Sequence, residues 1–327
     1  MRSPHELAPL SLAALLSACG AGPSPSGDAG ASDVPDARLS DVAVPDAASD
    51  APALRVQPAY DGPERAPDFS CLGARSAPTP SDDGPGFLVE VRDFQLESRL
   101  AGARLNVFLG DAALGACSAP RCFTATTDAM GVATLRGQPG ATLRVEVLAE
   151  RRGDNDALNL ARSVHLGVRV PAAGAPLALA SISEATRRYL PLNAGLTVAP
   201  GDGQLMGVAR DCAGAALKHA RVRVFDAQGV EVALGATGPG AAYTNVLHRP
   251  DRAQLATSFN GQFVVVNLPP GPSYRVEAWG RVEGESAARR VACEVLPTWP
   301  EAVTVGDLAP LRTPSPGDPC GEAARGP

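Results

Sequence analysis

Histidine is the residue that most often carries acid–base chemistry near neutral pH. The chain has four histidines, they are widely separated, and none begins a His-x-x-Glu pair. No serine lies in a Gly-x-Ser-x-Gly nucleophile elbow. Spacing alone does not exclude a catalytic triad, because the fold assembles such triads. His5 lies in the N-terminal segment, and we expect His165, His219 and His248 to face solvent. The sequence therefore predicts that the protein is not an enzyme.

Metal and cofactor motifs are incomplete. Asp154, Asn155 and Asp156 form the best calcium candidate, because a loop of this kind supplies oxygen ligands, but the remaining ligands of a defined loop are missing. The glycine-rich stretch at 201–207 has the wrong spacing for a dinucleotide fingerprint and no βαβ context. We predict no metal site and no cofactor.

The cysteines indicate disulfide bonds. Apart from Cys19 there are six, an even number that is typical of proteins in an oxidising compartment. Zinc is the rival interpretation, but one Cys-x4-Cys pair without a nearby histidine suits it poorly. One expected pair brackets a short loop, one joins two strands of the same predicted module, and one joins the start of the body to its tail. These pairs are Cys117 with Cys122, Cys212 with Cys293, and Cys71 with Cys320.

The N-terminus reads as a targeting segment. Residues 7–18 form an apolar run of signal-peptide length that is too short to span a bilayer comfortably. The run ends in Leu-Ser-Ala-Cys-Gly, which resembles the lipobox of bacterial lipoproteins. The resemblance implies a signal peptide over residues 1–18, a lipid on Cys19 and, since Gly20 is not aspartate, the outer membrane. The alternative is an ordinary secretory signal with a chance cysteine.

Residues 19–80 are rich in Ala, Asp, Pro, Ser and Gly, a composition that buries too little apolar surface to fold. Nine acidic residues and three arginines lie between Gly20 and Asp68, so this segment carries the whole net charge of −6. We expect a disordered, acidic tether. The rest of the chain is neutral and has no basic face, so we predict no nucleic-acid partner.

Short alternating segments separated by Gly and Pro turns predict an all-β fold. We expect two tandem antiparallel β-sandwich modules, at residues 81–198 and 199–312, and a tail at 313–327. Residues 183–189 are the one helix candidate, and residues 243–255 are expected to form a long loop. Residues 102–108 align with 219–225, which indicates an internal repeat. The predicted strands are 87–93, 103–109, 132–135, 143–147, 163–170, 177–182, 206–211, 220–225, 263–268, 274–279, 289–295 and 303–308.

The second module resembles the carboxypeptidase regulatory-like domain of the transthyretin-like class. The resemblance rests on a turn, an apolar strand, a Pro-Gly turn and an alternating strand within residues 257–279. The matching positions are Thr257, Gly261, Phe263, Leu268, Pro270, Gly271, Tyr274 and Val276. Residues 87–148 match more loosely. The resemblance implies a β-sandwich with an accessory role and brings no catalytic residues.

Three aromatic residues stand at strand positions opposite to the expected core positions Val107, Val224 and Ala278. Aromatic side chains exposed on a sheet face often bind partners or sugars. The alternative is that they pack under loops or between modules, since large apolar side chains are usually buried. The candidate surface comprises Phe108, Phe225 and Trp279.

These observations predict a lipid-anchored protein of the bacterial cell envelope with a non-catalytic binding, adhesion or scaffolding role. The expected partners are the membrane, through the N-terminal lipid, and an unidentified envelope protein or polysaccharide. Two alternatives remain open: a carbohydrate-binding accessory lipoprotein, and an extracytoplasmic hydrolase that uses a polar cleft containing one of the histidines.

Overall fold

The computed structural model describes most of the body of the chain. The described residues are 57–58, 67–71, 84–109, 114, 117–118, 121–149, 160–171, 176–245, 249–282, 285–310 and 319–320. The signal segment with Cys19, the calcium candidate at 154–156, His248 and most of the predicted tether lie outside them. No helix in the described part is long and apolar enough to cross a membrane.

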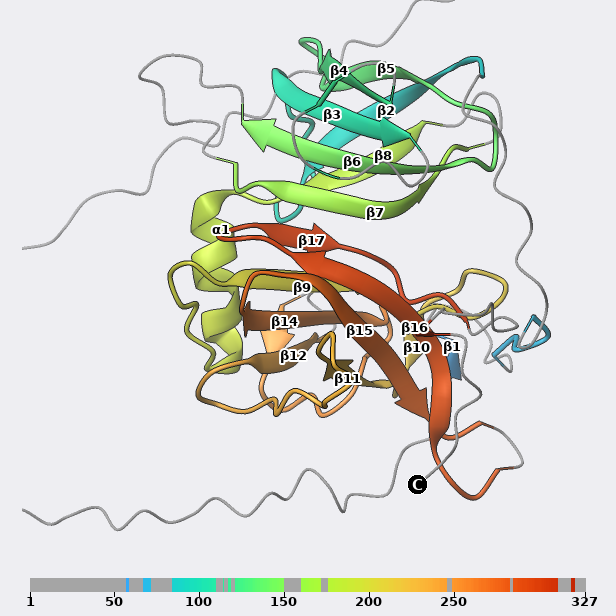
Figure 1. The fold of residues 1–327 in the computed structure, drawn as a ribbon, viewed down its shortest axis with the longest axis vertical. Coiled ribbons are helices and arrows are strands. Elements are labelled where there is room, and N and C mark those ends of the chain that lie inside the picture. The colour runs from blue at the N-terminus through green and yellow to red at the C-terminus, as the bar shows by residue number, and fades with distance from the viewer. Residues whose placement is uncertain are drawn as a thin grey trace, which may run out of the picture. The chain divides into compact units, whose positions relative to one another are not determined.

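The described chain is mostly β-strand, as the sequence predicts (Figure 1). Residues 84–182, with their gaps, are here called the first sandwich, and residues 203–310 the second. The first contains β2 Gly86–Asp93, β3 Ala103–Leu109, β4 Cys122–Thr126, β5 Val132–Arg136, β6 Thr142–Ala149, β7 Ser163–Arg169 and β8 Leu177–Ser181.

A short helical segment connects the two sandwiches. Helix α1 spans Glu184–Tyr189 and the 3₁₀ helix η2 spans Leu190–Ala194, with Ser183 capping α1. The second sandwich contains β9 Gly203–Val208, β10 Leu217–Lys218, β11 Arg221–Phe225, β12 Gly240–Thr244, β13 Pro250–Asp251, β14 Gln262–Leu268, β15 Gly271–Gly280, β16 Arg289–Thr298 and β17 Val303–Val305. The short strand β1, Gln57–Pro58, pairs with β10.

Turn chemistry sets several strand ends. Gly131 and Gly261 have φ values of +72° and +64°, the left-handed region that the predicted tight turns require. Asn267 also has a positive φ, +59°, where the pairing of β14 with β9 shifts register. Asparagine tolerates this conformation, and the Asn267 amide donates to the carbonyls of Thr197 and Gly238. The predicted strand at 263–268 is therefore present but bulged.

The expected long loop at 243–255 was wrong in part, because it contains the end of β12 and all of β13. The sequence Gly-Ala-Ala-Tyr-Thr of β12 has weak strand propensity. Its Tyr243 lies opposite Phe263 in β14, and the Tyr243 hydroxyl accepts a hydrogen bond from the Val222 N–H. Contacts distant in sequence thus make this segment a strand.

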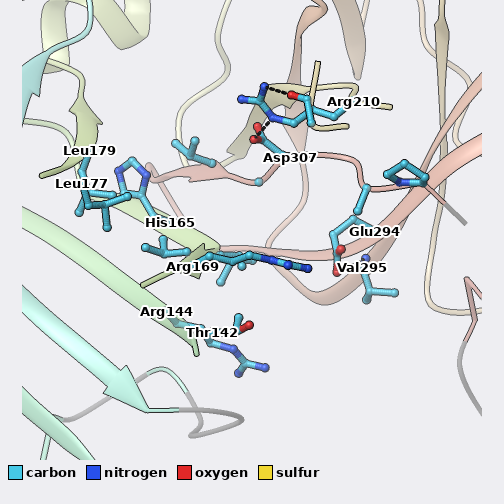
Figure 2. A pocket seen from close by; sticks show the side chains of 18 of the residues that line it. Thr142, Arg144, His165, Arg169, Leu177, Leu179, Arg210, Glu294, Val295 and Asp307 are labelled. Atoms are coloured by element: carbon cyan, nitrogen blue, oxygen red, sulfur yellow. Dashed lines mark hydrogen bonds and ion pairs between the residues drawn. The ribbon is translucent and has the colours of Figure 1, made fainter. Parts of the chain in front are cut away.

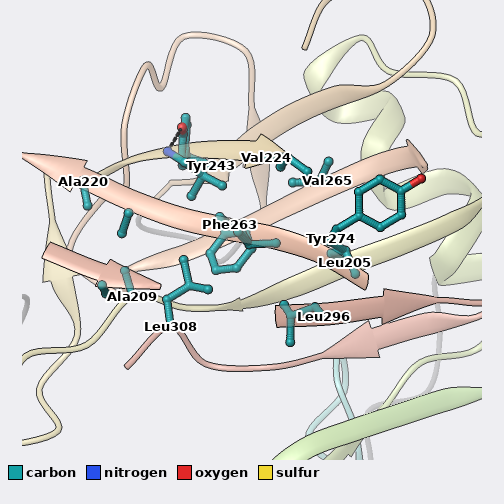
Figure 3. Close-up of a cluster of buried hydrophobic side chains, with 14 of the residues drawn as sticks. Leu205, Ala209, Ala220, Val224, Tyr243, Phe263, Val265, Tyr274, Leu296 and Leu308 are labelled. Carbon is teal, nitrogen blue, oxygen red and sulfur yellow. Dashed lines mark hydrogen bonds between the residues drawn. The ribbon is translucent and has the colours of Figure 1, made fainter. Parts of the chain in front are cut away.

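Two three-stranded sheets, β5-β2-β8 and β11-β15-β16, pack on a nine-stranded sheet of order β13-β12-β14-β9-β17-β7-β6-β3-β4. A cluster that includes Val89, Leu135 and Val145 fills the first sandwich. A second cluster fills the other sandwich around Phe263 and Leu296 (Figure 3). Most strand pairs are antiparallel, as expected, but β2 pairs with β8 in parallel.

Strand β17 joins the two sandwiches. It pairs in parallel with β7 of the first sandwich on one edge and with β9 of the second on the other. Thr304 lies between Val164 and Leu205, is fully buried, and donates to the Pro297 carbonyl. The nine-stranded sheet is therefore continuous across both sandwiches.

The two small sheets lie on opposite faces of the nine-stranded sheet. Neighbouring residues on a strand point to opposite faces. On β7, His165 pairs with Val145, a residue of the first core, whereas the next residue, Leu166, packs against the second core. On β9 and β14, the face that points away from the second core is covered by η2 and the residues after it. The resulting cluster comprises Ala194 and Leu196 of the covering segment and Ala242, Val264 and Val266 of β12 and β14.

Gly207 in β9 has no side chain, and this allows the backbone of Gly306, the residue after β17, to approach closely. A Cβ at Gly207 would lie 1.9 Å from the Gly306 carbonyl oxygen. We expect Gly207→Ala to lower the free energy of unfolding by about 3 kcal/mol, because overpacking here must displace backbone. Urea denaturation measures the change.

Gly235→Ala is the matched control, because the nearest atom to its Cβ is 3.9 Å away. We expect this change to alter the free energy of unfolding by less than about 0.5 kcal/mol. Equal stability of the two variants would contradict the role assigned to Gly207.

Candidate binding surfaces

The six body cysteines form three disulfides: Cys71–Cys212, Cys117–Cys122 and Cys293–Cys320. The predicted pair Cys117–Cys122 is confirmed. The two other predicted pairs were wrong. Since the six sulfurs are disulfide-bonded, they offer no thiolates for the rival zinc site. No group of three or more His, Cys, Asp or Glu residues in the described part could hold a metal ion.

The structure explains why the predicted disulfides Cys212–Cys293 and Cys71–Cys320 do not form. Cys293 lies opposite Glu277 in β15, so its side chain is on the outer face of its sheet, whereas Cys212 follows β9 in the other sheet. The segment before Cys71 docks on the Cys212 region, because the Cys212 N–H donates to the Asp68 carbonyl. The Cys293 N–H likewise donates to the Ala309 carbonyl, which brings the chain's end alongside β16.

Phe108 is not part of an exposed surface, so this part of the predicted aromatic face was wrong. Its side chain is 1% exposed and packs with Cys117, Cys122 and Leu114. It does point away from the first core, as the strand alternation predicts. Leu114 and the Cys117–Cys122 disulfide pack against it, which is the packing alternative.

Phe225 and Trp279 do lie on one face, the outer face of the sheet β11-β15-β16. Both are partly buried, and Arg223 lies between them. The Arg223 guanidinium carbon is 4.8 Å from the Trp279 ring centroid and 5.3 Å from that of Phe225. The Arg275 guanidinium carbon is 4.3 Å from the Phe225 ring centroid. Cation–π stacking of this kind holds rings and guanidinium groups in a fixed order, here called the aromatic ladder.

Glu277 lies beneath the aromatic ladder and is 2% exposed. It accepts hydrogen bonds of 2.7 Å from both the Trp279 indole N–H and Arg290, which is 5% exposed. Arg275 Nε is 3.0 Å from the same carboxylate. A buried carboxylate requires such partners, so the ladder has a structural role.

A groove of about 1590 Å³ runs along the junction of the two sandwiches (Figure 2). One wall carries side chains of β6 and β7, including Arg144 and Arg169. The facing wall carries Glu294 and Val295 of β16, and Asp307 follows β17. Asp307 pairs with Arg210 across the groove's upper part in Figure 2.

His165 also lines the groove, but its side chain is buried rather than facing solvent, so that expectation was wrong. The ring is hydrogen-bonded to the Ala180 backbone, and Nε2 has no partner. Desolvation by burial lowers the pKa of His165 to about 4. The ring is therefore neutral near pH 7. His219, by contrast, is partly exposed and has a positive φ of 66°.

The groove is not apparent from the sequence. The outward positions of Arg144 and Arg169 follow from strand alternation, but their neighbourhood depends on how β17 joins β7 to β9 of the second sandwich. The parallel pairing of a three-residue strand has no recognisable pattern in the sequence. The available signal was limited to arginines at outward positions of adjacent strands.

No model of a known protein family matches the chain, and neither does any curated protein. Among solved structures, the Bacillus anthracis TIE protein is 16% identical with a TM-score of 0.21, and the match covers 70% of this chain and 34% of that one. The shaft pilin SpaA of Lactobacillus rhamnosus GG is 13% identical, with a TM-score of 0.22 and coverage of 71% and 99%. The Streptococcal ancillary pilin is 14% identical, with a TM-score of 0.23 and coverage of 70% of each chain.

This chain thus spans about a third of the TIE protein. Similarities of this size carry no argument about function. The resemblances to bacterial lipoproteins and to the carboxypeptidase regulatory-like domain stay predictions.

The buried pair of Glu277 and Arg290 yields a stability prediction. Glu277→Gln removes the buried carboxylate that accepts a hydrogen bond from Arg290, and we expect the free energy of unfolding to fall by about 3 kcal/mol. Glu231→Gln is the matched control, because the Glu231–Arg223 ion pair is well exposed. It should cost less than about 1 kcal/mol. Denaturant titration of both variants measures the difference, and equal losses would contradict the assignment.

The buried His165 yields a pH prediction. Its pKa is about 4 in the folded protein, against 6.5 for a histidine in water, so between these values the unfolded chain binds a proton that the folded protein does not. The contribution of His165 therefore lowers the free energy of unfolding as the pH falls from 6.5 to 4, by about 3 kcal/mol in total. His165→Phe should remove this part of the pH dependence. Parallel stability curves for the two proteins over that range would contradict the prediction.

Proposed function

We propose that the protein is a lipid-anchored, non-catalytic binding or scaffolding protein of the bacterial cell envelope. The observation that carries the proposal is the pairing of β17 with both β7 and β9. Backbone hydrogen bonds connect the two sandwiches through this strand, so they resist independent rotation. A body of this kind suits holding a surface in a fixed orientation, and the proposed modules are residues 81–198 and 199–312.

The covalent closure of the body supports the same proposal. Cys71–Cys212 ties the end of the predicted tether to the second sandwich, and Cys293–Cys320 ties the tail to β16. Disulfides persist in oxidising compartments outside the cytoplasm. In this proposal, the lipid on Cys19 attaches the protein to the membrane and the acidic segment up to Asp68 separates the body from the bilayer.

A second candidate function is carbohydrate binding by an accessory lipoprotein. The observation that favours it is the partly exposed aromatic ladder, since Trp and Phe rings on a sheet face suit sugar rings. The stacking of Arg223 and Arg275 on these rings weakens this candidate, because guanidinium groups already occupy ring faces that a sugar would use.

The anchor is tested by Cys19→Ala. We expect this variant to move from the membrane fraction to the soluble fraction, because the only predicted attachment is the acyl chain on Cys19. Immunoblotting of membranes washed with high salt measures the distribution. Cys122→Ala, which breaks a body disulfide instead, should stay with the membranes. Retention of the Cys19→Ala protein in washed membranes would contradict lipid anchoring.

A further inference from the structure

One side of the groove between the sandwiches is formed by interior strands of the nine-stranded sheet. The strands behind it, β6, β7 and β17, are each paired on both sides. Its volume of about 1590 Å³ exceeds the range of roughly 300–1,000 Å³ that is usual for small-molecule sites. The groove therefore suits a segment of an extended polymer better than a single small ligand.

The charges in the groove are unevenly distributed. Arg169 of β7 lies directly opposite Thr142 of β6. Arg144 is two residues after Thr142 on β6, so its side chain is on the same face. The two arginines therefore share the outer face of β6 and β7. Both extend into the groove in Figure 2. Arg169 is exposed, and no ion pair joins it to another residue in the described part.

The carboxylates in the groove are engaged by other groups. Asp307 pairs with Arg210. Asp211 accepts hydrogen bonds from the N–H groups of Asp68 and Ala215. Glu294 accepts a hydrogen bond from the Val295 N–H and is the acidic residue that faces the arginine wall. Figure 2 shows Arg169 extending toward the wall that carries it. The wall on β6 and β7 is thus cationic in a chain that is acidic overall.

We propose that this groove binds a polysaccharide that carries carboxylate groups, with Arg169 and Arg144 contacting the carboxylates. Glu294 opposes the anion and limits the affinity. The inference rests on the proposed non-catalytic binding role and names its ligand class. Guanidinium groups suit this task because their planar fork binds a carboxylate through two parallel hydrogen bonds.

Two other polymers fit the groove less well. An extended peptide gains affinity by adding a strand to an open sheet edge. In the groove, β6, β7 and β17 are paired on both sides, and the edge strands β8 and β16 already bond to other groups, to the His165 ring at Ala180 and to the Ala309 carbonyl at Cys293. Single-stranded nucleic acid needs aromatic platforms on which bases stack, and no Phe, Tyr or Trp is among the described lining residues. A chain of acidic sugars requires only cations and hydroxyl partners such as Thr142.

Calorimetric titration of the purified full-length protein with polygalacturonate tests the proposal. We expect binding that weakens with rising salt, and no binding of neutral dextran. Arg169→Glu should weaken the affinity about tenfold, the effect of losing and reversing one charge-assisted contact. Glu294→Gln should tighten it about threefold by removing the opposing charge. A gain in affinity is a result that damage to the fold does not produce.

Arg136→Glu is the matched control, since Arg136 is exposed on β5, outside the groove. Its affinity should equal that of the unchanged protein. The proposal is overturned if Arg136→Glu weakens binding as much as Arg169→Glu, or if polyglutamate or single-stranded DNA binds as tightly as polygalacturonate. It is also overturned if Trp279→Ala abolishes binding while Arg169→Glu preserves it, which would move the site to the aromatic ladder. None of these results bears on the lipid anchor, which membrane fractionation tests separately.

Discussion

The two-sided pairing of β17 is the interaction on which the rest of the structure depends. A strand of three residues, Val303–Val305, hydrogen-bonds to β7 and β9 in parallel. Without it, both neighbours would be sheet edges, which are prone to pair with other chains. The insertion is possible because Gly207 and Gly306 allow their backbones to approach closely. Two small backbone sites thus decide whether the chain forms one sheet or two.

Other contacts reinforce the same junction. Arg162, next to β7, pairs with Glu146 and stacks on Trp299 at 5.3 Å from the ring centroid. The Arg162 carbonyl also accepts the Val303 N–H. Trp299 belongs to the second sandwich and Glu146 to the first. A single arginine therefore connects the strand, the first sandwich and the second.

The groove is a consequence of how the sheets cover one another. Each small sheet covers its own half of the nine-stranded sheet, and they do so on opposite faces. Beside β16, the outer face of β6 and β7 is left without a covering sheet of its own. Outward side chains such as Arg144 and Arg169 therefore line a depression. In a single sandwich the same residues would stand on an open convex surface.

The sequence by itself determined the all-β class, because strand alternation and Gly or Pro turns depend on neighbouring residues only. It also located most strands, the left-handed turns at Gly131 and Gly261, and the short disulfide Cys117–Cys122. These features are set by local backbone conformation and by short loops. The outward direction of Phe108, Phe225 and Trp279 was likewise readable from alternation.

The tertiary structure decided which residues those side chains contact. Phe108 is buried against the Cys117–Cys122 disulfide, and Arg223 stacks between Phe225 and Trp279, although all three rings occupy equivalent outward positions. The long-range disulfides, the burial of His165 and the groove were also decided at this level. The disulfides depend on the docking of Asp68 and Ala309, and the groove and the surroundings of His165 depend on the packing of β17 and β8 beside β7. These are contacts between residues far apart in the chain. Local patterns carry no information about such contacts, because the energy that selects them comes from close approach of complete strands.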